Sequence, residues 1–274
     1  LPRAGQHLDV HYFHPPSVTG EVSYQHSKLV ASTRGRFRRP EAIFTNISLM
    51  PDSAARSDMS IRLVGESAQA VQGYLAASFG DDLVRLRQAA EDARRAGVLV
   101  NEPRTGTSML GDAMRALVDT AERRIHIVSK GLDDPDFAAR LVQARQRGVD
   151  VTVVVRDLAR RDARLLHDAG IRVVVQPSST VASRVNMLVA DDLALASTAY
   201  QWTPMMRHGA VNSRESGVLL AGRDAVHAIR QLRASAEGSV ALAGAEALGQ
   251  TALPTGFSAV EDALASMRLV ASLT

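Results

Sequence analysis

The chain has 274 residues, a formal net charge of +3 and no cysteine. This length is enough for one large hydrophobic core or two ordinary ones. The composition excludes disulfides, thiol nucleophiles and cysteine-ligated metal sites, and no segment approaches the roughly 20 continuous apolar residues of a membrane-spanning helix. The small positive charge gives only slight support for an anionic partner.

The first part of the chain contains short apolar runs typical of strands, followed by one helical pattern. Strands are predicted over 9–15, 28–31, 43–46 and 57–65, and a helix over 67–78. An arginine-rich insertion at 34–39 separates the second and third strands. A charged helix is then expected over 81–96, and the turn-forming residues of 97–106 indicate a linker.

The second part alternates helical and strand patterns. Helices are predicted over 107–124, 134–147 and 158–169, and strands over 125–128, 151–155 and 171–175. Such an alternation is typical of a layered α/β domain with right-handed crossovers. Strands are then expected over 187–190, 193–198 and 216–221, with a closing helix over 224–236. The tail 238–274 is rich in Ala and Leu and predicts one or two packing helices, with a membrane-surface role as the alternative.

The two parts align as an internal repeat. Segments 9–15, 28–31, 43–46 and 57–65 match 171–177, 186–189, 196–199 and 214–222, in the same order. The second copy has about 65 residues of β-α-β-α pattern ahead of its matching strands, and the first copy has almost nothing there. We therefore expect a removed segment or a separate polypeptide to complete the first copy, because an open apolar sheet edge invites aggregation.

Candidate catalytic residues cluster in the first copy. His26 and Lys28 are two positions apart, so on a strand their side chains share one face. An ammonium binds a phosphate oxygen, and an imidazole attacks phosphorus or protonates a leaving oxygen. Asn46 would donate to another phosphate oxygen, and Asp58 would orient the imidazole. The set His26, Lys28, Asn46 and Asp58 predicts a phosphodiester site that needs no metal.

These residues resemble the phospholipase D superfamily, whose H-x-K, Gly-Ser-x-Asn and acidic motifs occur twice and meet at a pseudo-twofold axis. The first copy departs from the family at Thr33 and at 43–44. The second copy keeps Asp191, Ser197 and Glu215. It has Arg184, Asn186 and Ala199 at the positions of the family's histidine, lysine and asparagine.

The resemblance implies an α/β fold of two repeats, with mixed, mainly parallel sheets flanked by helices and with the N-terminal part of the first repeat lacking. It divides the chain into the C-terminal part of the first repeat (1–80), a helical linker (81–106), a second repeat with a degenerate motif (107–237) and a helical tail (238–274). The same resemblance favours a bacterial cell-envelope, periplasmic or secreted location over the cytoplasm.

The resemblance also assigns roles. His26 would be the nucleophile of a phosphohistidine intermediate, without metal or other cofactor, and Arg184, Asn186, Ser197 and Glu215 would bind the substrate. Arg184 cannot act as the family's general acid, because a guanidinium keeps its proton near neutral pH. Loss of a general acid costs roughly 10²–10⁴-fold in rate, unless a second molecule supplies the missing histidine.

Three functions remain open. The first is a phospholipase D-like phosphodiesterase or phosphatidyltransferase acting on phospholipids, because the chain is similar to the cardiolipin synthase-like and phospholipase members of the family. The second is a catalytically impaired pseudoenzyme that binds lipid or protein, and the third is a metal-independent nuclease. The expected partners are a phospholipid or another phosphodiester, a membrane surface, and the segment or chain that completes the first repeat.

Other polar clusters have simpler explanations. His7, Asp9, His11 and His14 suggest a metal site, but strand alternation sends neighbouring side chains to opposite faces. His126 and Lys130 belong to the end of the predicted strand 125–128, and a substrate role is the alternative. The arginines of 34–39 fit a solvated loop, or a site for anionic lipid or nucleic acid.

Overall fold

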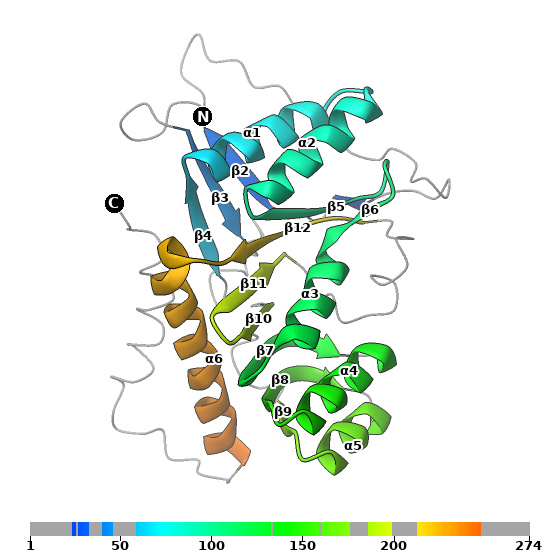
Figure 1. The fold of residues 1–274 in the computed structure, drawn as a ribbon, viewed down its shortest axis with the longest axis vertical. Coiled ribbons are helices and arrows are strands. Elements are labelled where there is room, and N and C mark those ends of the chain that lie inside the picture. The colour runs from blue at the N-terminus through cyan, green and yellow to red at the C-terminus, as the bar shows by residue number, and fades with distance from the viewer. Residues whose placement is uncertain are drawn as a thin grey trace.

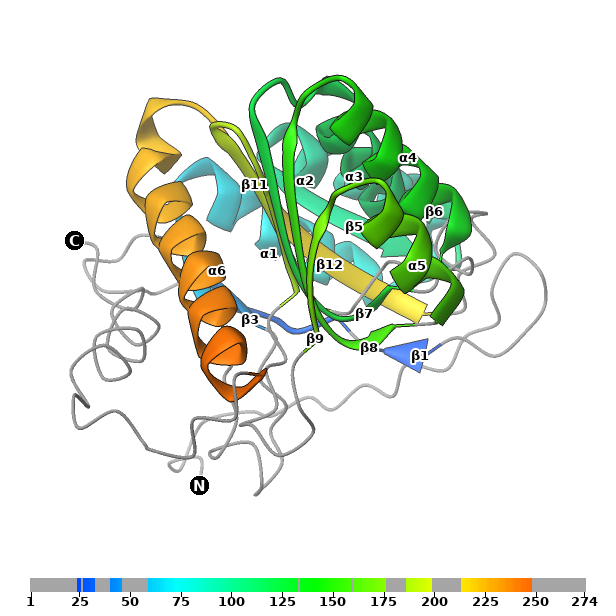
Figure 2. The ribbon, with the colours of Figure 1, turned by 90° about the horizontal axis from the view of Figure 1, so that it is seen from below.

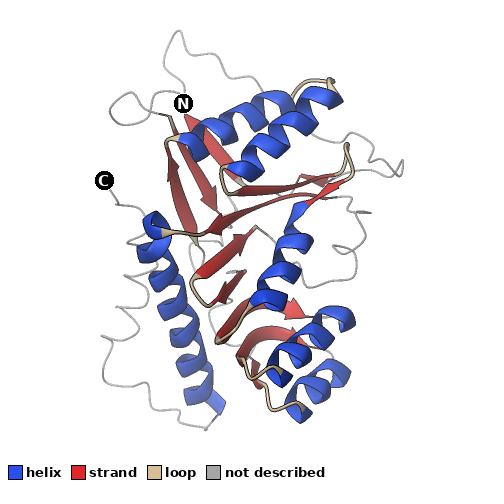
Figure 3. Ribbon diagram, viewed as in Figure 1, coloured by secondary structure: helices blue, strands red, loops and turns tan. Residues whose placement is uncertain are grey.

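The computed structural model describes residues 24–25, 27–32, 40–45, 59–132, 134–158, 160–175, 186–198 and 213–247. Within these residues the chain forms a large mixed sheet and a smaller antiparallel sheet, with helices packed against both (Figures 1 and 3). The large sheet has the order β6-β5-β12-β11-β10-β7-β8-β9, with β1 paired to β12. No helix of the described residues is long and apolar enough to cross a membrane.

The predicted β-α-β-α-β unit is confirmed. Strands β7 (Arg124–Leu132), β8 (Asp150–Leu158) and β9 (Arg172–Val175) pair in parallel, and they are connected by α4 (Pro135–Gln146) and α5 (Arg160–Asp168). The start of α4 follows from its sequence. The Asp134 side chain accepts hydrogen bonds from the backbone N–H groups of Asp136 and Phe137, at 3.0 and 3.3 Å, and Pro135 occupies the first turn.

Antiparallel strands extend this unit and form the rest of the large sheet. They are β10 (Met187–Ala190), β11 (Leu193–Ser197), β12 (Ser213–Leu220), β5 (Val98–Glu102) and β6 (Thr107–Ser108). The sheet is therefore mixed, as expected, but the expectation of mainly parallel pairing holds only for β7 to β9 and for β1 with β12. Sharp antiparallel connections such as the turn between β10 and β11 need few residues, whereas parallel pairs need a crossover.

Helices cover both faces of the β7–β12 region (Figure 2). The helix α3 (Met109–Thr120) packs against β5, β10 and β11, and α6 (Val226–Ala247) packs against β7 to β11. The predicted closing helix 224–236 is longer than expected: Arg223–Ala225 form a 3-10 turn, and α6 continues to Ala247. The expected start of the tail at 238 therefore lies inside this helix, and residues beyond 247 lie outside the described part.

The smaller sheet consists of β2 (Leu29–Ser32), β3 (Glu41–Thr45) and β4 (Ser60–Val64), in that order. The helix α1 (Glu66–Ser78) covers the face that bears Phe44 and Leu63, both buried. Three antiparallel strands followed by a helix also describe β10-β11-β12-α6, and Gly65 and Gly222 precede the two helices with φ values of 63° and 78°. Positive φ favours glycine at this shared turn.

Strand pairing shifts one segment of the sequence alignment, 43–46, by one residue relative to the second copy. Leu29 pairs with Phe44, and Ile61 also pairs with Phe44. In the second half, Met187 and Val218 both pair with Ala196. Phe44 is therefore equivalent to Ala196 rather than to Ser197, and position 46 is equivalent to Thr198 rather than to Ala199. The shift escapes the sequence because both segments are short and their residues match at either register.

The segment 81–106 is more than the helical linker that was expected. The charged helix is confirmed as α2 (Leu83–Arg95), which begins at the capping side chain of Asp82. The turn-rich remainder, however, contains β5, which is fully buried and pairs with β12. Its apolar residues span only 98–100 before two polar residues, which is too short a run to distinguish a strand from a linker in the sequence.

Candidate functional site

The two halves of the chain meet where β1 (Tyr24–Gln25) adds in parallel to the start of β12. The Ser27 backbone N–H donates to the Arg214 carbonyl at 2.6 Å, and the Ser27 hydroxyl donates to the Ser216 hydroxyl at 2.8 Å. One residue later, the Lys28 carbonyl accepts from the Thr45 N–H at 3.1 Å, which extends the β2–β3 ladder. The segment 27–28 therefore connects the large sheet to the small one.

This crossing corrects the predicted strand geometry at the H-x-K segment. Ser27 and Lys28 lie between β1 and β2, because the chain changes partner strands at this point. The period-two argument that placed two side chains on one strand face therefore does not apply at Lys28. The Lys28 side chain is partly buried, and His26 lies outside the described residues.

The predicted second-half residues lie on adjoining strands. Asn186 precedes β10, Ser197 ends β11 and Glu215 is in the first half of β12, and all three are buried. The Ser197 N–H donates to the Asn186 carbonyl at 2.9 Å, and Ser197 pairs with Gly217. The fold thus brings these three predicted residues to one end of three neighbouring strands, beside the crossing at 27–28.

The Glu215 carboxylate is held by hydroxyl groups. Thr198 donates to its Oε2 at 2.8 Å and Ser213 donates to its Oε1 at 2.7 Å. The Thr198 hydroxyl also accepts from the Ser216 N–H at 3.1 Å, so it holds both the Glu215 carboxylate and the backbone of β12. Sequence analysis missed Thr198, and the only signal that would have revealed it is the corrected register, in which Thr198 occupies the position of Asn46.

Asn186 occupies the position at which the resembling family has lysine, and its side chain forms hydrogen bonds with residues of the neighbouring strand β7. Its Oδ1 accepts from the Ser129 hydroxyl at 3.3 Å and from the Lys130 N–H at 3.4 Å. Lys130 is thereby brought to the same end of the sheet. A buried amide with these partners stabilises the joint between β7 and β10, as burial of a polar group requires.

Several predicted residues lie outside the described part of the chain. These are His26, Asn46, Asp58 and Arg184, together with the cluster His7 to His14 and the arginines of 34–39. Among the described residues, no group of three or more His, Asp or Glu side chains is arranged to hold a metal ion. The roles predicted for the residues outside the described part of the chain stay predictions.

Two further candidates lie away from this strand end. Burial lowers the pKa of His126 below its usual value, and the charges that act on it include Glu237 and Arg233 of α6. His126 therefore faces α6 rather than the junction. Asp191, which the second copy shares with the family, accepts hydrogen bonds from three successive backbone N–H groups at 122–124.

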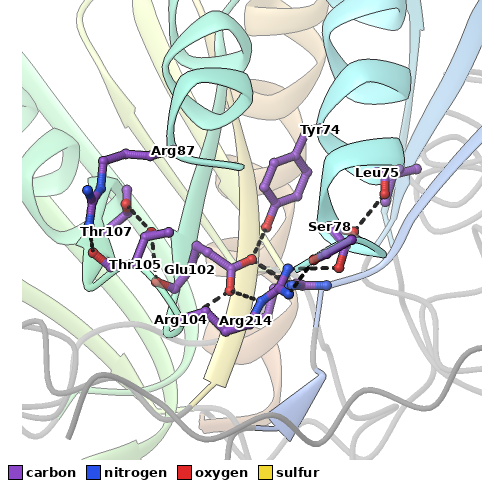
Figure 4. Close-up of polar contacts among 10 residues, drawn as sticks. Tyr74, Leu75, Ser78, Arg87, Glu102, Arg104, Thr105, Thr107 and Arg214 are labelled. Carbon is purple, nitrogen blue, oxygen red and sulfur yellow. Dashed lines mark hydrogen bonds and ion pairs between the residues drawn. The ribbon is translucent and has the colours of Figure 1, made fainter. Parts of the chain in front are cut away.

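A buried ionic cluster lies next to the junction (Figure 4). The guanidinium of Arg214 contacts the Glu102 carboxylate at 2.7 and 2.8 Å, and the Tyr74 hydroxyl donates to the same carboxylate at 3.0 Å. Arg104 reaches Glu102 at 3.5 Å and donates to the carbonyls of Ser78 and Gly80. Burial, together with the Glu102 charge, raises the pKa of Tyr74 far above its usual range, so the phenol remains a donor.

This cluster was not found from the sequence. Glu102 belongs to the unpredicted strand β5, and Arg214 and Tyr74 are far apart in the chain. Tyr74 comes from α1, whereas Glu102 and Arg214 come from β5 and β12, so the cluster joins the two halves. Because Arg214 precedes Glu215, it also fixes the strand that presents the Glu215 carboxylate.

Comparison with solved structures identifies the fold class. Part of polyphosphate kinase from Porphyromonas gingivalis matches with a TM-score of 0.56 at 14% identity, over 80% of this chain and 34% of that protein. Nuc from Salmonella typhimurium, a phospholipase D family member, matches with a TM-score of 0.36 at 18% identity, over 44% of this chain and 80% of Nuc. Phosphatidylserine synthase from Haemophilus influenzae matches with a TM-score of 0.47 at 9% identity, over 65% of this chain and 55% of the synthase.

The match to polyphosphate kinase shows a shared α/β fold over most of this chain, and the phospholipase D family member Nuc and phosphatidylserine synthase are among the other structures that it resembles. Identities below 20% with these structures show the shared fold alone. No family model matches the sequence, and no curated protein matches it either.

Proposed function

We propose that this chain is a phospholipase D-like phosphodiesterase or phosphatidyltransferase that acts on phospholipids at the junction of its two halves. The crossing at 27–28 is the observation that supports this function. It ties the segment that follows His26 to Arg214 and Ser216, which flank Glu215. Ser27 of one half thus lies beside the strand of the other half that bears Glu215, and this contact supports two cooperating half-sites.

In the proposed reaction, an imidazole nitrogen of His26 attacks phosphorus and the bond from phosphorus to the head-group oxygen breaks. Lys28 and Asn46 bind the non-bridging oxygens, and Asp58 holds the imidazole proton. Arg184 adds positive charge to the phosphate without giving up a proton, so water protonates the departing alkoxide. Water or an alcohol then displaces the phosphohistidine, which yields hydrolysis or transfer respectively.

The test is turnover of vesicles of phosphatidylglycerol and of phosphatidylcholine, with EDTA present, by the purified protein and by two histidine variants. His26→Ala should abolish release of the head group. His167→Ala is the matched control, because that side chain is exposed on α5, and it should retain full activity. Equal turnover by all three proteins, or turnover by none of them, contradicts the proposal.

A noncatalytic role is the second candidate. It is favoured by the hydrogen bonds that the polar side chains of the second half already form with neighbouring residues. Both oxygens of Glu215 and the Oδ1 of Asn186 accept hydrogen bonds from neighbouring residues, so these groups stabilise the strand ends. If wild type and His26→Ala bind the same vesicles equally well and neither protein turns over either lipid, the protein is a lipid-binding pseudoenzyme.

Single-stranded DNA and polyphosphate belong in the same assay as competing phosphate substrates, since DNA cleavage in EDTA would make the protein a nuclease.

A further inference from the structure

Among the residues that the structure describes, helices pack on only one face of the sheet β2-β3-β4. Its inner face packs on α1, whereas its outer face exposes Val30 (59%), Ile43 (44%) and Val64 (56%). Val30 and Ile43 are directly opposite each other on neighbouring strands, so their exposed surfaces are contiguous. Contiguous exposed apolar surface on a sheet indicates an interaction site.

The internal repeat shows what covers the equivalent face. By strand pairing, Val30 corresponds to Leu188 and Ile43 to Leu195, and these two leucines are also opposite each other. Leu188 is 0% exposed and Leu195 is 1% exposed. A Cβ atom on Gly217 would meet both Leu195, at 3.3 Å, and Leu110 of α3, at 2.5 Å, so α3 lies on this face.

The edge of the sheet shows the same difference. In the second half, β10 pairs with β11 along one edge and with β7 along the other, where Leu188 lies opposite Ile127. In the first half, β2 is the last strand of its sheet among the described residues. Both elements that are added in the second half, α3 and β7, are consecutive in the chain. One helix–strand segment therefore supplies the cover and the edge together.

We infer that the outer face and free edge of β2-β3-β4 bind a helix–strand segment contributed by polypeptide outside these 274 residues. The strand of this segment adds antiparallel to β2, as β7 adds to β10. Its helix places apolar side chains on Val30 and Ile43, as α3 does on Leu188 and Leu195.

The composition of the face further specifies the partner. Arg62 and Glu41 form an ion pair at 2.6 Å on this same face, next to Ile43 and Val64, whereas the second-half face has Leu219 and Leu193 at these positions. The partner helix is therefore amphipathic with a polar residue over the ion pair, rather than apolar across its whole face. This inference is independent of the proposed activity.

Cysteine labelling tests the inference, because the chain has no cysteine of its own. Ile43→Cys and Val30→Cys report on the face, and Val84→Cys, at an exposed position of α2, is the control. In the purified 274-residue chain, a maleimide should label all three positions rapidly. When the same variants are expressed from the complete gene in the source cells, positions 43 and 30 should react at least about tenfold more slowly than before, and position 84 should be unchanged.

A photo-crosslinker attached to the thiol of the Ile43→Cys variant then identifies the covering peptide in the slowly reacting sample. The inference requires a peptide from outside the 274 residues with an amphipathic helical pattern followed by an apolar strand. Equal labelling in both samples overturns it, and so does protection already present in the purified chain. A crosslink to a second copy of this chain, or to a peptide without that pattern, also overturns it.

Discussion

The carboxylate of Asp191 accepts three backbone hydrogen bonds, from the N–H groups of Glu122, Arg123 and Arg124, at 2.8 to 3.0 Å. Asp191 itself has a φ of 47°, a conformation that Asp and Asn tolerate better than most residues. Burial tends to raise its pKa, but the three backbone donors and Arg123 lower it by more, so its pKa lies below the usual value. The carboxylate therefore stabilises the turn that leads into β7.

Replacement of Asp191 by Asn should show this contribution as a pH-dependent loss of stability. Asn keeps the left-handed backbone but loses the charge, so the free energy of unfolding at pH 7 should fall by about 1 kcal/mol. Because the folded pKa is depressed, the contribution is fully present above the ordinary pKa of about 3.9 and is lost as pH falls through the folded pKa.

Urea unfolding of wild type and Asp191→Asn across a pH series measures this difference. Asp168→Asn is the control, since that side chain is exposed on α5. It should leave stability almost unchanged at every pH. A difference between wild type and Asp191→Asn that stayed constant down to pH 2 would rule out the charge as its cause.

The strand β12 has a glycine where a neighbouring helix approaches most closely. A Cβ atom on Gly217 would lie 2.5 Å from Leu110 Cδ2 and 2.9 Å from the Ala196 carbonyl oxygen. Because one of these neighbours is backbone, it cannot move aside cheaply. The absence of a side chain at Gly217 thus sets the distance between α3 and the sheet.

Gly217→Ala should lower the free energy of unfolding by about 1–3 kcal/mol through overpacking. Gly73→Ala is the matched control, because Gly73 lies within α1 and a Cβ atom there would meet nothing within 4 Å. This control should raise stability by about 0.5–1 kcal/mol, the usual gain from replacing a helical glycine. Chemical denaturation of both variants distinguishes the outcomes, and equal shifts in the same direction would contradict the packing argument.

The elements that the sequence predicted best are those with long periodic patterns. The α3 to β9 region was predicted closely, because caps such as Asp134 and buried runs such as 151–155 are unambiguous. The strand β5 was missed because its apolar run has three residues. The one-residue error in aligning 43–46 has the same origin, since pairing with distant strands decides register and the sequence does not contain it.

For the candidate site, the repeat alignment brought three residues to neighbouring strand ends, and the roles assigned to these residues stay predictions. Asn186, Ser197 and Glu215 do lie together, as a matched repeat requires. Thr198, by contrast, was identified only through strand pairing, and the contacts of Glu215 with Thr198 and Ser213 depend on side-chain geometry. Spacing along a chain indicates which residues can approach one another, and packing determines the partners that each polar atom takes.

At the scale of the whole molecule, polar contacts as well as apolar packing join the two halves. Tyr74 of α1 and Arg214 of β12 both contact the carboxylate of Glu102, and the Arg214 guanidinium lies 5.9 Å from the centre of the Tyr74 ring. All three side chains are almost fully buried. Removal of Arg214 breaks the close pair and leaves the buried Glu102 charge with only the longer contact to Arg104, at 3.5 Å.

Arg214→Leu should therefore lower the free energy of unfolding by about 3–5 kcal/mol. Arg62→Leu is the matched control, because Arg62 pairs with Glu41 at 2.6 Å on a partly exposed surface. It should cost no more than about 1 kcal/mol, since solvent screens that pair. Arg214→Lys should recover only part of the loss, because an ammonium keeps the charge but cannot bind Glu102 through two nitrogens. Urea unfolding gives all three values, and similar losses for Arg214→Leu and Arg62→Leu would show that apolar packing alone holds the halves together.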